Sequence, residues 1–558
     1  MIQFRTKVSG CLLCAVLCLG LLAGCTRTEE PSVSEPGSGT VSQLPEESSQ
    51  PAETEAESGS DSEPDTPETV SAAPSGTEQT ADVPSSATAT QGEPEGTTEP
   101  ETESSSAEDT SVETNDATES ETAEIETSGE ADRKGKEFRI LSATRAPAGM
   151  ASSNCFLEGE QNTAGTINEA VHERNTAVEL ELDVALTFSH ADADKSDIQS
   201  EIKRLVMSGA DAYDLVISEL LPFASLANDG TFRNILSSEF TGFDFENKPY
   251  WHKEYMDDLR LVNGYEYLLA GDFFIDVLRS SHLLLFNKEM YRDHYRRDPG
   301  EVFEWVLNYE WTYEKLNGII TDMYLDKNGN SRRDYGDRWG LSISDLRSAK
   351  IGFIVSADPG LVSRSEDGTP RIVLGDTSRM ADLTKRLSLL LFNSSCYISD
   401  AAGGNSLRDF TEGSALLCEG HWLGSLENTA LPDMKEGAGV LPYPQLYASD
   451  KRYITATSNT ANVGAVLLTA KDEAFISTVI QALNRETASR LIPKYYRDAL
   501  KLRYDADPYT AGMIRILHDN IGGSFMLAYG NQAIDGSGNP VGTVSESVTG
   551  GIKRYNTN

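Results

Sequence analysis

Three places in the sequence carry polar or aromatic side chains in settings that suit the binding of a small polar molecule. Glu219 follows a short apolar run typical of a buried strand, and α/β sheets hold ligands at such strand ends; a solvated loop acid is the alternative. Asp272, Phe273 and Phe274 form a polar and aromatic cluster, or else a turn aspartate beside two core residues. Trp422 stands between glycines, which predicts a loop. Its indole face suits the apolar face of a sugar ring, and a core tryptophan is the alternative.

Residues 326–337 place oxygen-bearing side chains at the spacing of a calcium-binding loop. In EF-hand-like loops, positions 1, 3, 5, 9 and 12 supply side-chain oxygens and position 7 supplies a backbone carbonyl. These positions hold Asp326, Asn328, Asn330, Asp334 and Asp337, with the carbonyl of Arg332 at position 7. Ser331 stands where such loops usually have glycine, and aspartate replaces the usual glutamate at the last position. We expect a structural Ca²⁺ site, and a polar turn without metal is the alternative.

Motifs of known enzyme classes do not stand out. The sequence lacks a Gly-x-x-x-x-Gly-Lys-Ser/Thr phosphate loop, a Gly-x-Ser-x-Gly nucleophile turn and a His-Glu-x-x-His zinc pair. The histidines are scattered without metal-ligand spacing. A carboxylate pair of the kind that glycosidases use stays open, because so acidic a chain offers many candidates. The residue types favour binding over catalysis and no catalytic residue is assigned.

The N-terminus has the features of a bacterial lipoprotein signal. Arg5 and Lys7 form a short basic segment, and the apolar run after them is too short for a permanent membrane span. Leu22-Ala23-Gly24-Cys25 resembles the lipobox, at which the peptide is cut before a cysteine that is then acylated. We expect residues 1–24 to be the signal peptide and Cys25 to be lipidated, so that the protein is extracytoplasmic and anchored to the cell membrane by lipid alone. An ordinary secretory signal is the alternative.

Composition divides the rest of the chain in two. The net charge of the sequence is −41, and the segment from residue 26 to 130 holds 28 acids, one base and no aromatic residue. Such a segment cannot bury enough apolar surface to offset its chain entropy. We therefore expect residues 25–135 to be a disordered acidic stalk. Nucleic acid is not an expected partner of so acidic a chain.

After residue 135 the pattern becomes that of an α/β fold. Strands are expected at 138–141, 180–188, 213–217 and 283–286, and helices from Thr166, over 198–206 and over 475–483. Alternating strands and helices imply a largely parallel sheet covered on both faces. This part is long enough for two lobes with separate cores.

Several local patterns follow one another along this part of the chain. They are Tyr213-Asp214-Leu215-Val216 with Leu226-Ala227-Asn228-Asp229-Gly230, Asn263-Gly264-Tyr265-Glu266-Tyr267, Leu285-Phe286-Asn287-Lys288, Glu310-Trp311-Thr312-Tyr313-Glu314, and Phe410-Thr411-Glu412-Gly413-Ser414-Ala415 before Gly420-His421-Trp422. In this order they resemble the extracellular solute-binding proteins of ABC importers, in the group that handles carbohydrates. Trp311 and Thr312 are transposed relative to that family's pattern.

The resemblance implies an α/β, periplasmic-binding-protein-like fold over residues 136–520, with two lobes joined by a hinge around a central cleft. It implies capture of a solute, in the first place an oligosaccharide, by lobe closure and delivery to the permease subunits of an ABC transporter. Trp422, Glu219, Asp272 and Phe273 are the expected ligand-binding residues. The alternatives are a lipid-anchored carbohydrate-active enzyme and a sensory or adhesion lipoprotein on the same scaffold. Residues 521–558 form a Gly-rich C-terminal segment without an assigned role.

Overall fold

The computed structural model describes residues 134–144, 150, 152–159, 166–191, 195–344, 347–372, 377–399, 405–428, 438–500 and 508–530. All of them belong to one compact unit. The predictions for the signal peptide, for Cys25, for the stalk up to residue 133 and for residues 531–558 lie outside the described residues. Within the described residues, none of the helices combines the length and the apolar character that crossing a membrane requires.

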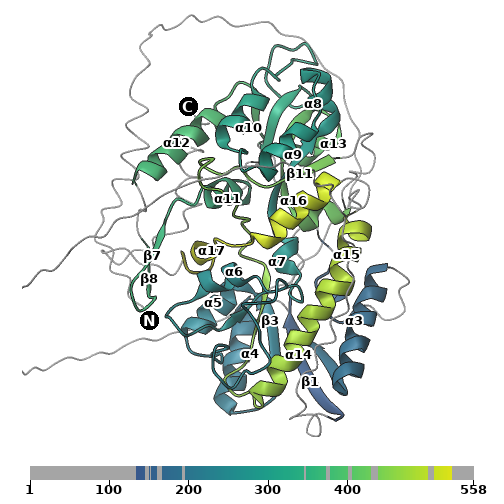
Figure 1. Ribbon diagram of the computed structural model, residues 1–558, viewed down its shortest axis with the longest axis vertical. Helices are drawn as coiled ribbons and strands as arrows, with labels where there is room; N and C mark the ends of the chain where they lie inside the picture. Colours follow the sequence, from purple (N-terminus) through teal and green to yellow (C-terminus); the bar gives the residue numbers. More distant parts are fainter. Residues whose placement is uncertain are drawn as a thin grey trace, which may run out of the picture. The chain divides into compact units, whose positions relative to one another are not determined.

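The first lobe, which contains β1 and β3 in Figure 1, is built on a five-stranded sheet with the strand order β2-β1-β3-β12-β4. Its strands are β1 (Lys136–Ala143), β2 (Val184–His190), β3 (Leu215–Glu219), β4 (Leu268–Leu269) and β12 (Asn462–Ala465). β1 runs parallel to β2 and β3, whereas β12 runs antiparallel to both β3 and β4. The helices that pack on and beside this sheet are α3 (Thr166–Leu182), α4 (Lys195–Ser208), α5 (Leu220–Asn228), α6 (Lys253–Leu259) and α14 (Glu473–Glu486).

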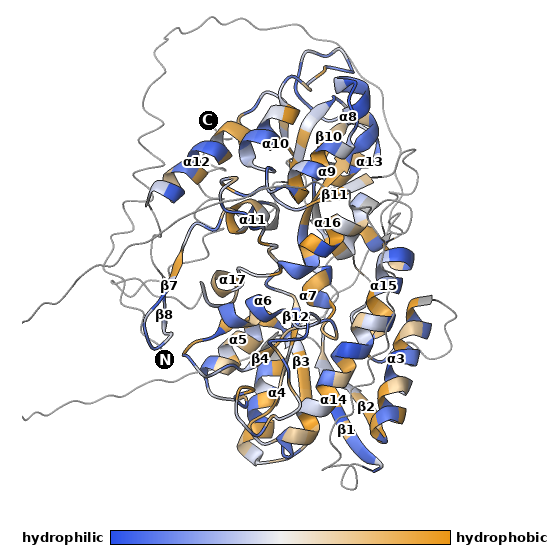
Figure 2. Ribbon diagram, in the orientation of Figure 1, coloured by the Kyte–Doolittle hydropathy of each residue, from blue (hydrophilic) through white to orange (hydrophobic). Residues whose placement is uncertain are grey.

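The second lobe is built on another five-stranded sheet, with the order β11-β5-β10-β6-β9. Its strands are β5 (His282–Asn287), β6 (Trp339–Ser344), β9 (Cys396–Ser399), β10 (Ala415–Trp422) and β11 (Ala438–Leu441). β6 runs parallel to β9 and β10, whereas β5 runs antiparallel to both β10 and β11. The helices of this lobe include α8 (Lys288–Tyr295), α9 (Gly300–Leu307), α10 (Tyr313–Ile320), α11 (Arg347–Ser356), α12 (Thr377–Leu391) and α13 (Asn405–Thr411). In Figure 2 the helices carry alternating apolar and polar stretches, as helices with one face on a core do.

The strand that runs against its neighbours is, in each sheet, the first strand after the chain has crossed from the other lobe. The chain leaves β4 and enters the second lobe as β5, and it leaves β11 and returns to the first lobe as β12. A strand that enters a lobe at the junction must run away from the junction. The parallel strands of both sheets therefore point their carboxyl ends toward the junction, where the amino ends of β5 and β12 also lie.

The C-terminal part of the described chain crosses between the lobes once more. After the irregular helical segment 487–499, α16 (Pro508–Asp519) packs on β11 and α9 of the second lobe. α17 (Phe525–Tyr529) then packs on α5 and α6 of the first lobe, with Phe525 and Tyr529 buried. The folded part thus continues past residue 520, where the sequence predicted its end. A short buried helix of this kind is hard to recognise beside glycine-rich sequence.

Most of the predicted elements are confirmed, including β1, the start of α3 at Thr166, α4, β5 and α14. The strand predicted for residues 180–188 is wrong at its beginning, because Leu180 to Leu182 still belong to α3. The alternation of apolar residues there fits a strand, but Val178 and Leu182 are also one helical turn apart. Asp183, in a left-handed conformation with φ 52°, ends the helix before β2 begins.

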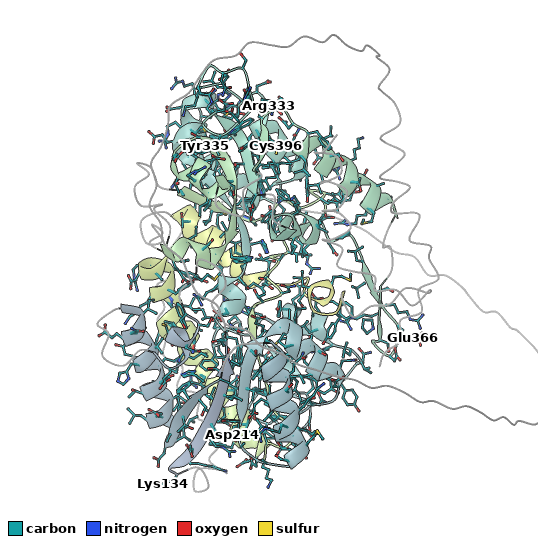
Figure 3. All side chains as sticks on the ribbon, turned by 180° about the vertical axis from the view of Figure 1, so that it is seen from behind. Lys134, Asp214, Arg333, Tyr335, Glu366 and Cys396 are labelled. Carbon is teal, nitrogen blue, oxygen red and sulfur yellow. The ribbon has the colours of Figure 1, made fainter. Side chains whose placement is uncertain are left out.

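A hairpin from the second lobe reaches the first lobe. Its strands β7 (Val362–Arg364) and β8 (Pro370–Ile372) follow α11. The guanidinium of Arg364 donates to the carbonyl oxygens of Asp257, Asp258 and Arg260 at 3.1, 2.7 and 2.6 Å, at the carboxyl end of α6. The last carbonyls of a helix lack the usual intrahelical donors, and the hairpin supplies donors to them here. Figure 3 labels Glu366 in its turn.

The packing of β12 on the first lobe generates a stability prediction. A Cβ atom at Gly464 would lie 2.3 Å from Cε1 of Phe274, so Gly464→Ala must displace a buried ring. We expect a loss of about 1–3 kcal/mol in the free energy of unfolding, measured by urea denaturation. The matched control is Gly318→Ala in α10, where the added atom meets nothing within 4 Å. This control should leave stability unchanged or raise it by about 0.5–1 kcal/mol. Equal effects of the two substitutions would contradict the packing described here.

Candidate ligand-binding site

The strand directions bring two of the predicted ligand residues to the junction of the lobes. Glu219 is the last residue of β3 and pairs with Asn462, the first residue of β12. Trp422 is the last residue of β10 and pairs with His282, the first residue of β5. Both residues therefore stand at the sheet edge where α/β proteins hold ligands.

Trp422 belongs to a strand and not to a loop, which corrects the sequence prediction of its setting. The pairing of β10 with β5 shifts register between Glu419 and Trp422, so the glycine at position 420 lies in an irregularity of the strand. Glycine inside a strand often marks such a bulge. The indole is half-buried, and its Nε1 donates to Nε2 of His282 at 3.2 Å.

Tyr443 extends this aromatic group on the second lobe. Its ring centroid lies 6.4 Å from that of His282, and its side chain is buried. Burial, with the nearby carboxylate of Glu419, raises the pKa of Tyr443 well above its usual value, so the phenol stays neutral. The hydroxyl has no hydrogen-bond partner within the described part of the chain. Sequence reasoning missed His282 and Tyr443, because neither stands in a motif.

A buried chain of charges ties the crossing segments together next to this group. Arg279, in the short helix α7 (Asp276–Arg279), donates to Oδ1 of Asp276 at 2.5 Å. It also donates to both carboxylate oxygens of Glu427, from Nε at 2.8 Å and from Nη2 at 2.9 Å. Tyr495 donates its hydroxyl to Glu427 at 2.9 Å, and the amide nitrogen of Asn462 donates to Asp276.

Arg279 is fully buried, so its charge depends on these partners. Burial alone would lower the pKa of Arg279, but Asp276 and Glu427 raise it above its usual value. The guanidinium also lies 4.3 Å from the ring centroid of Phe156. A Cβ atom at Gly424 would lie 3.1 Å from Cβ of Arg279, which shows how closely the chain after β10 approaches α7. The network joins β12, the segment between β4 and β5 that carries α7, and the chain after β10. It thereby fixes the surroundings of Trp422.

The other two predicted ligand residues lie elsewhere. Phe273 is fully buried, its backbone N–H donates to Oδ1 of Asn484 at 3.0 Å, and its ring faces the guanidinium of Arg174 at 4.9 Å. The structure thus places Phe273 in the core, the alternative that the sequence left open, and not at a ligand surface. Asp272 is also buried, and its Oδ1 accepts a hydrogen bond from Nε2 of His518 at 2.7 Å.

A cavity of about 240 Å³ lies between the lobes. Ile351, Ile354 and Val355 of α11 line it from the second lobe, and Phe525 to Leu527 of α17 line it from the first. Its walls are mainly apolar and none of the predicted ligand residues lines it. A second hollow, on the second lobe, is lined by Trp305 together with tyrosine, lysine and glutamate side chains of α8 and α10.

The predicted calcium loop is a turn anchored to the second lobe. The guanidinium of Arg333 lies 3.5 Å from the carbonyl oxygen of Cys396, and the hydroxyl of Tyr335 donates to Glu412 at 2.5 Å (Figure 3). Asp326 accepts the backbone N–H of Gly329 at 2.6 Å and that of Ser331 at 2.8 Å.

The remaining expected ligands of the loop come close to one another. The amide nitrogens of Asn328 and Asn330 donate to the two carboxylate oxygens of Asp334 at 2.9 and 2.8 Å. The hydroxyl of Tyr324 lies 3.2 Å from both the carbonyl oxygen of Arg332 and Oδ2 of Asp337. The loop's three carboxylates, of Asp326, Asp334 and Asp337, do not form a group with oxygens within 4.8 Å of one another.

The charge network generates a prediction. Arg279→Met leaves Asp276 and Glu427 buried without a cation, so we expect a loss of about 3–5 kcal/mol in the free energy of unfolding by urea denaturation. The control is Arg204→Met, which removes a surface arginine that is 67% exposed beside Glu201 and should cost less than about 1 kcal/mol. A loss at Arg279 no larger than that at Arg204 would show that the buried network does not hold the junction.

No family model matches the chain, and no curated protein matches it either. Solved structures similar to it include a Listeria monocytogenes protein described as uncharacterized, with 14% identity, a TM-score of 0.46, and coverage of 76% of this chain and 98% of that one. An ABC substrate-binding protein of the same organism, in complex with cycloalternan, has 15% identity, a TM-score of 0.43 and the same coverage. A cyclo/maltodextrin-binding protein complexed with maltotetraose has 10% identity, a TM-score of 0.45 and also the same coverage.

The fold itself follows from the strand orders and the crossings described above. Two mixed α/β lobes, each with one antiparallel strand supplied by a chain that arrives from the other lobe, form the periplasmic-binding-protein-like fold that the sequence resemblance implied. The described part of the chain thus has the two-lobed α/β fold class that the sequence predicted.

Proposed function

We propose that this protein is a solute-binding protein that captures an oligosaccharide between its lobes for an ABC importer. The observation that carries the proposal is the contact of Trp422 with His282 at the junction edge of the second sheet, with Glu219 at the junction edge of the first. An indole that is half-exposed offers a sugar ring an apolar face. The imidazole of His282 beside the indole, with the phenol of Tyr443 next to His282 and the carboxylate of Glu219 at the end of β3, offers hydrogen-bonding groups of the kind that sugar hydroxyls require.

The proposal includes the lipid anchor at Cys25 and an extracytoplasmic location. The support is the lipobox-like sequence Leu22-Ala23-Gly24-Cys25 and the acidic segment that follows it. A highly charged chain without aromatic residues repels itself and extends, which suits a tether between a membrane and a binding domain. Permease subunits of the importer are the expected protein partners, and they would receive the solute from the closed lobes.

An enzymatic role has one structural feature in its favour. Ser142 Oγ lies 2.6 Å from Nδ1 of His190, whose Nε2 lies 2.7 Å from Glu158. Ser142 is only 1% exposed, however, so a substrate does not reach its hydroxyl in this structure. The proposal is therefore binding without turnover, and recovery of intact sugar after incubation separates the two roles.

The ligand proposal predicts the effect of Trp422→Ala. Loss of a stacking indole should weaken oligosaccharide binding about ten- to a hundredfold, or about 1–3 kcal/mol, in calorimetric titrations against a panel of linear and cyclic oligosaccharides. The melting temperature should change little, because the indole is half-exposed.

The matched control is Trp305→Ala, which removes a half-buried indole from the hollow on the second lobe. Binding should survive this change. If Trp305→Ala abolishes binding and Trp422→Ala does not, the ligand lies in the hollow and not at the junction. If the wild-type protein binds no sugar in the panel, the proposed substrate class is wrong.

We also propose that the loop 326–337 binds a structural Ca²⁺ ion. Ser331 adopts the left-handed conformation, with φ 60°, at the position where calcium loops place glycine. Asp326 already accepts backbone N–H groups from within the loop, as the first carboxylate of such loops does. The amide groups of Asn328 and Asn330 face the carboxylate of Asp334, and rotation of these amides would present oxygen atoms in place of nitrogen.

A metal held only by the folded protein raises its stability by mass action. Calcium should therefore raise the melting temperature of the wild-type chain above the value in chelator, as measured by calorimetry. Asp326→Ala should remove the difference, whereas Asp367→Ala, in the turn of the β7–β8 hairpin, should retain it. Identical melting of the wild-type protein in calcium and in chelator would show that the loop is only a polar turn.

A further inference from the structure

We propose that His252, Asp272 and His518 form a binding site for a divalent transition-metal ion that prefers imidazole ligands, with Zn²⁺ as the probe. Within the described residues, these three make up the one group of histidine, cysteine or carboxylate side chains whose ligand atoms all lie within 4.8 Å of one another. Two imidazoles and one carboxylate are a ligand set that Zn²⁺ accepts, with the fourth position left for water or another group. This inference does not depend on the proposed sugar site.

The backbone fixes two of the three ligands on one face of a short ladder. Trp251 and Gly271 form an antiparallel bridge, the N–H of His252 donates to Ala270 at 3.1 Å, and the N–H of Asp272 donates to Tyr250 at 2.9 Å. Residues two positions apart on a ladder point to the same face, so the side chains of His252 and Asp272 are diagonal neighbours. The two side chains are 2% and 3% exposed.

His252 supplies the observation that points to a ligand. Its Nε2 is buried without a hydrogen-bond partner and lies 3.9 Å from Oδ1 of Asp272. A buried polar atom without a partner costs free energy, and a metal ion at this point would remove that cost. Burial, together with the neighbouring His518, lowers the pKa of His252 well below its usual value.

His518 enters the group from the second lobe, at the carboxyl end of α16. Its Nε2 lies 2.7 Å from Oδ1 of Asp272, and its Nδ1 lies 2.8 Å from Oδ1 of Asp519. Histidines that bind metal usually donate their other ring N–H to a carboxylate, which fixes the ring and the tautomer. Asp519 is thus in the place of such a positioning residue.

The distances suit an ion after a small adjustment. Ligand atoms of a tetrahedral Zn²⁺ site lie roughly 3.3 Å apart, since each is about 2.0–2.2 Å from the metal. The present separations from Oδ1 of Asp272 are 2.7 Å to His518 and 3.9 Å to His252, one shorter and one longer than this value. The ion would take the place of the proton between Nε2 of His518 and Oδ1 of Asp272. The ion would then link α16 of the second lobe to the segment between β4 and β5, which contains Asp272.

The test uses the full chain after removal of metals with a chelator. Zn²⁺ binding is measured by competition with a chromophoric chelator, and Co²⁺ binding by its visible absorption. The wild-type protein should bind one Zn²⁺ equivalent more than His252→Gln, and its Co²⁺ complex should show the bands of a tetrahedral site. Asp519→Asn should weaken the affinity about ten- to a hundredfold without removing the site.

His294→Gln is the control, because this histidine lies outside the group and should leave the stoichiometry unchanged. If His252→Gln does not fold, His518→Gln, at a less buried position, should show the same loss of one equivalent. The proposal is overturned if a folded variant of either histidine keeps the wild-type stoichiometry. It is also overturned if wild-type protein shows no tetrahedral Co²⁺ bands, in which case the three residues are only an ion pair and a buried imidazole.

Discussion

The direction in which the chain crosses between the lobes determines which strand ends, and therefore which side chains, lie at the junction. A segment that leaves one sheet at the junction must enter the other sheet at the junction, so β5 and β12 run against their neighbours. This constraint places the amino ends of these two strands beside the carboxyl ends of β3 and β10. Glu219 meets Asn462 on one side and Trp422 meets His282 on the other for this reason alone. Some of the side chains there are charged, and a buried charge costs free energy unless a group of opposite charge is paired with it.

Arg279 shows how the junction meets that requirement. A buried guanidinium is stable only with carboxylates in place, and Asp276 comes from the same turn of helix while Glu427 comes from the chain after β10. Buried ion pairs contribute little net stability compared with apolar residues, but they tolerate few alternative arrangements. The network therefore determines the position of the segment between β4 and β5 relative to the second lobe. Its net contribution to the free energy of unfolding is small by comparison with that of apolar packing. The half-buried indole of Trp422 obtains its orientation from this neighbourhood, through His282.

Local pattern was sufficient for most of the secondary structure and for the position of Glu219 at the end of a strand. For Trp422 it was misleading, because the nearby glycine marks a strand irregularity and not a loop. Residues 180–182 were misassigned because their apolar spacing fits a helix and a strand alike. Phe273 could not be told from an exposed aromatic, because only the position of Asn484 and Arg174 shows that it is enclosed. The group of His252, Asp272 and His518 was invisible for a different reason, since its members are brought together by three separate elements and no local spacing relates them.

The links between the lobes differ in how much they resist separation. The hairpin β7–β8 holds the first lobe through Arg364, which is exposed and bonded to backbone carbonyls that water can solvate equally well. The Arg279 network and the contact of His518 with Asp272 are buried and charged, so breaking either one leaves a charge without compensation in a dry environment. The mainly apolar cavity between α11 and α17 lies near the hairpin, where Arg364 is among its lining residues. One side of the junction is therefore held by exposed hydrogen bonds and the other by buried charges.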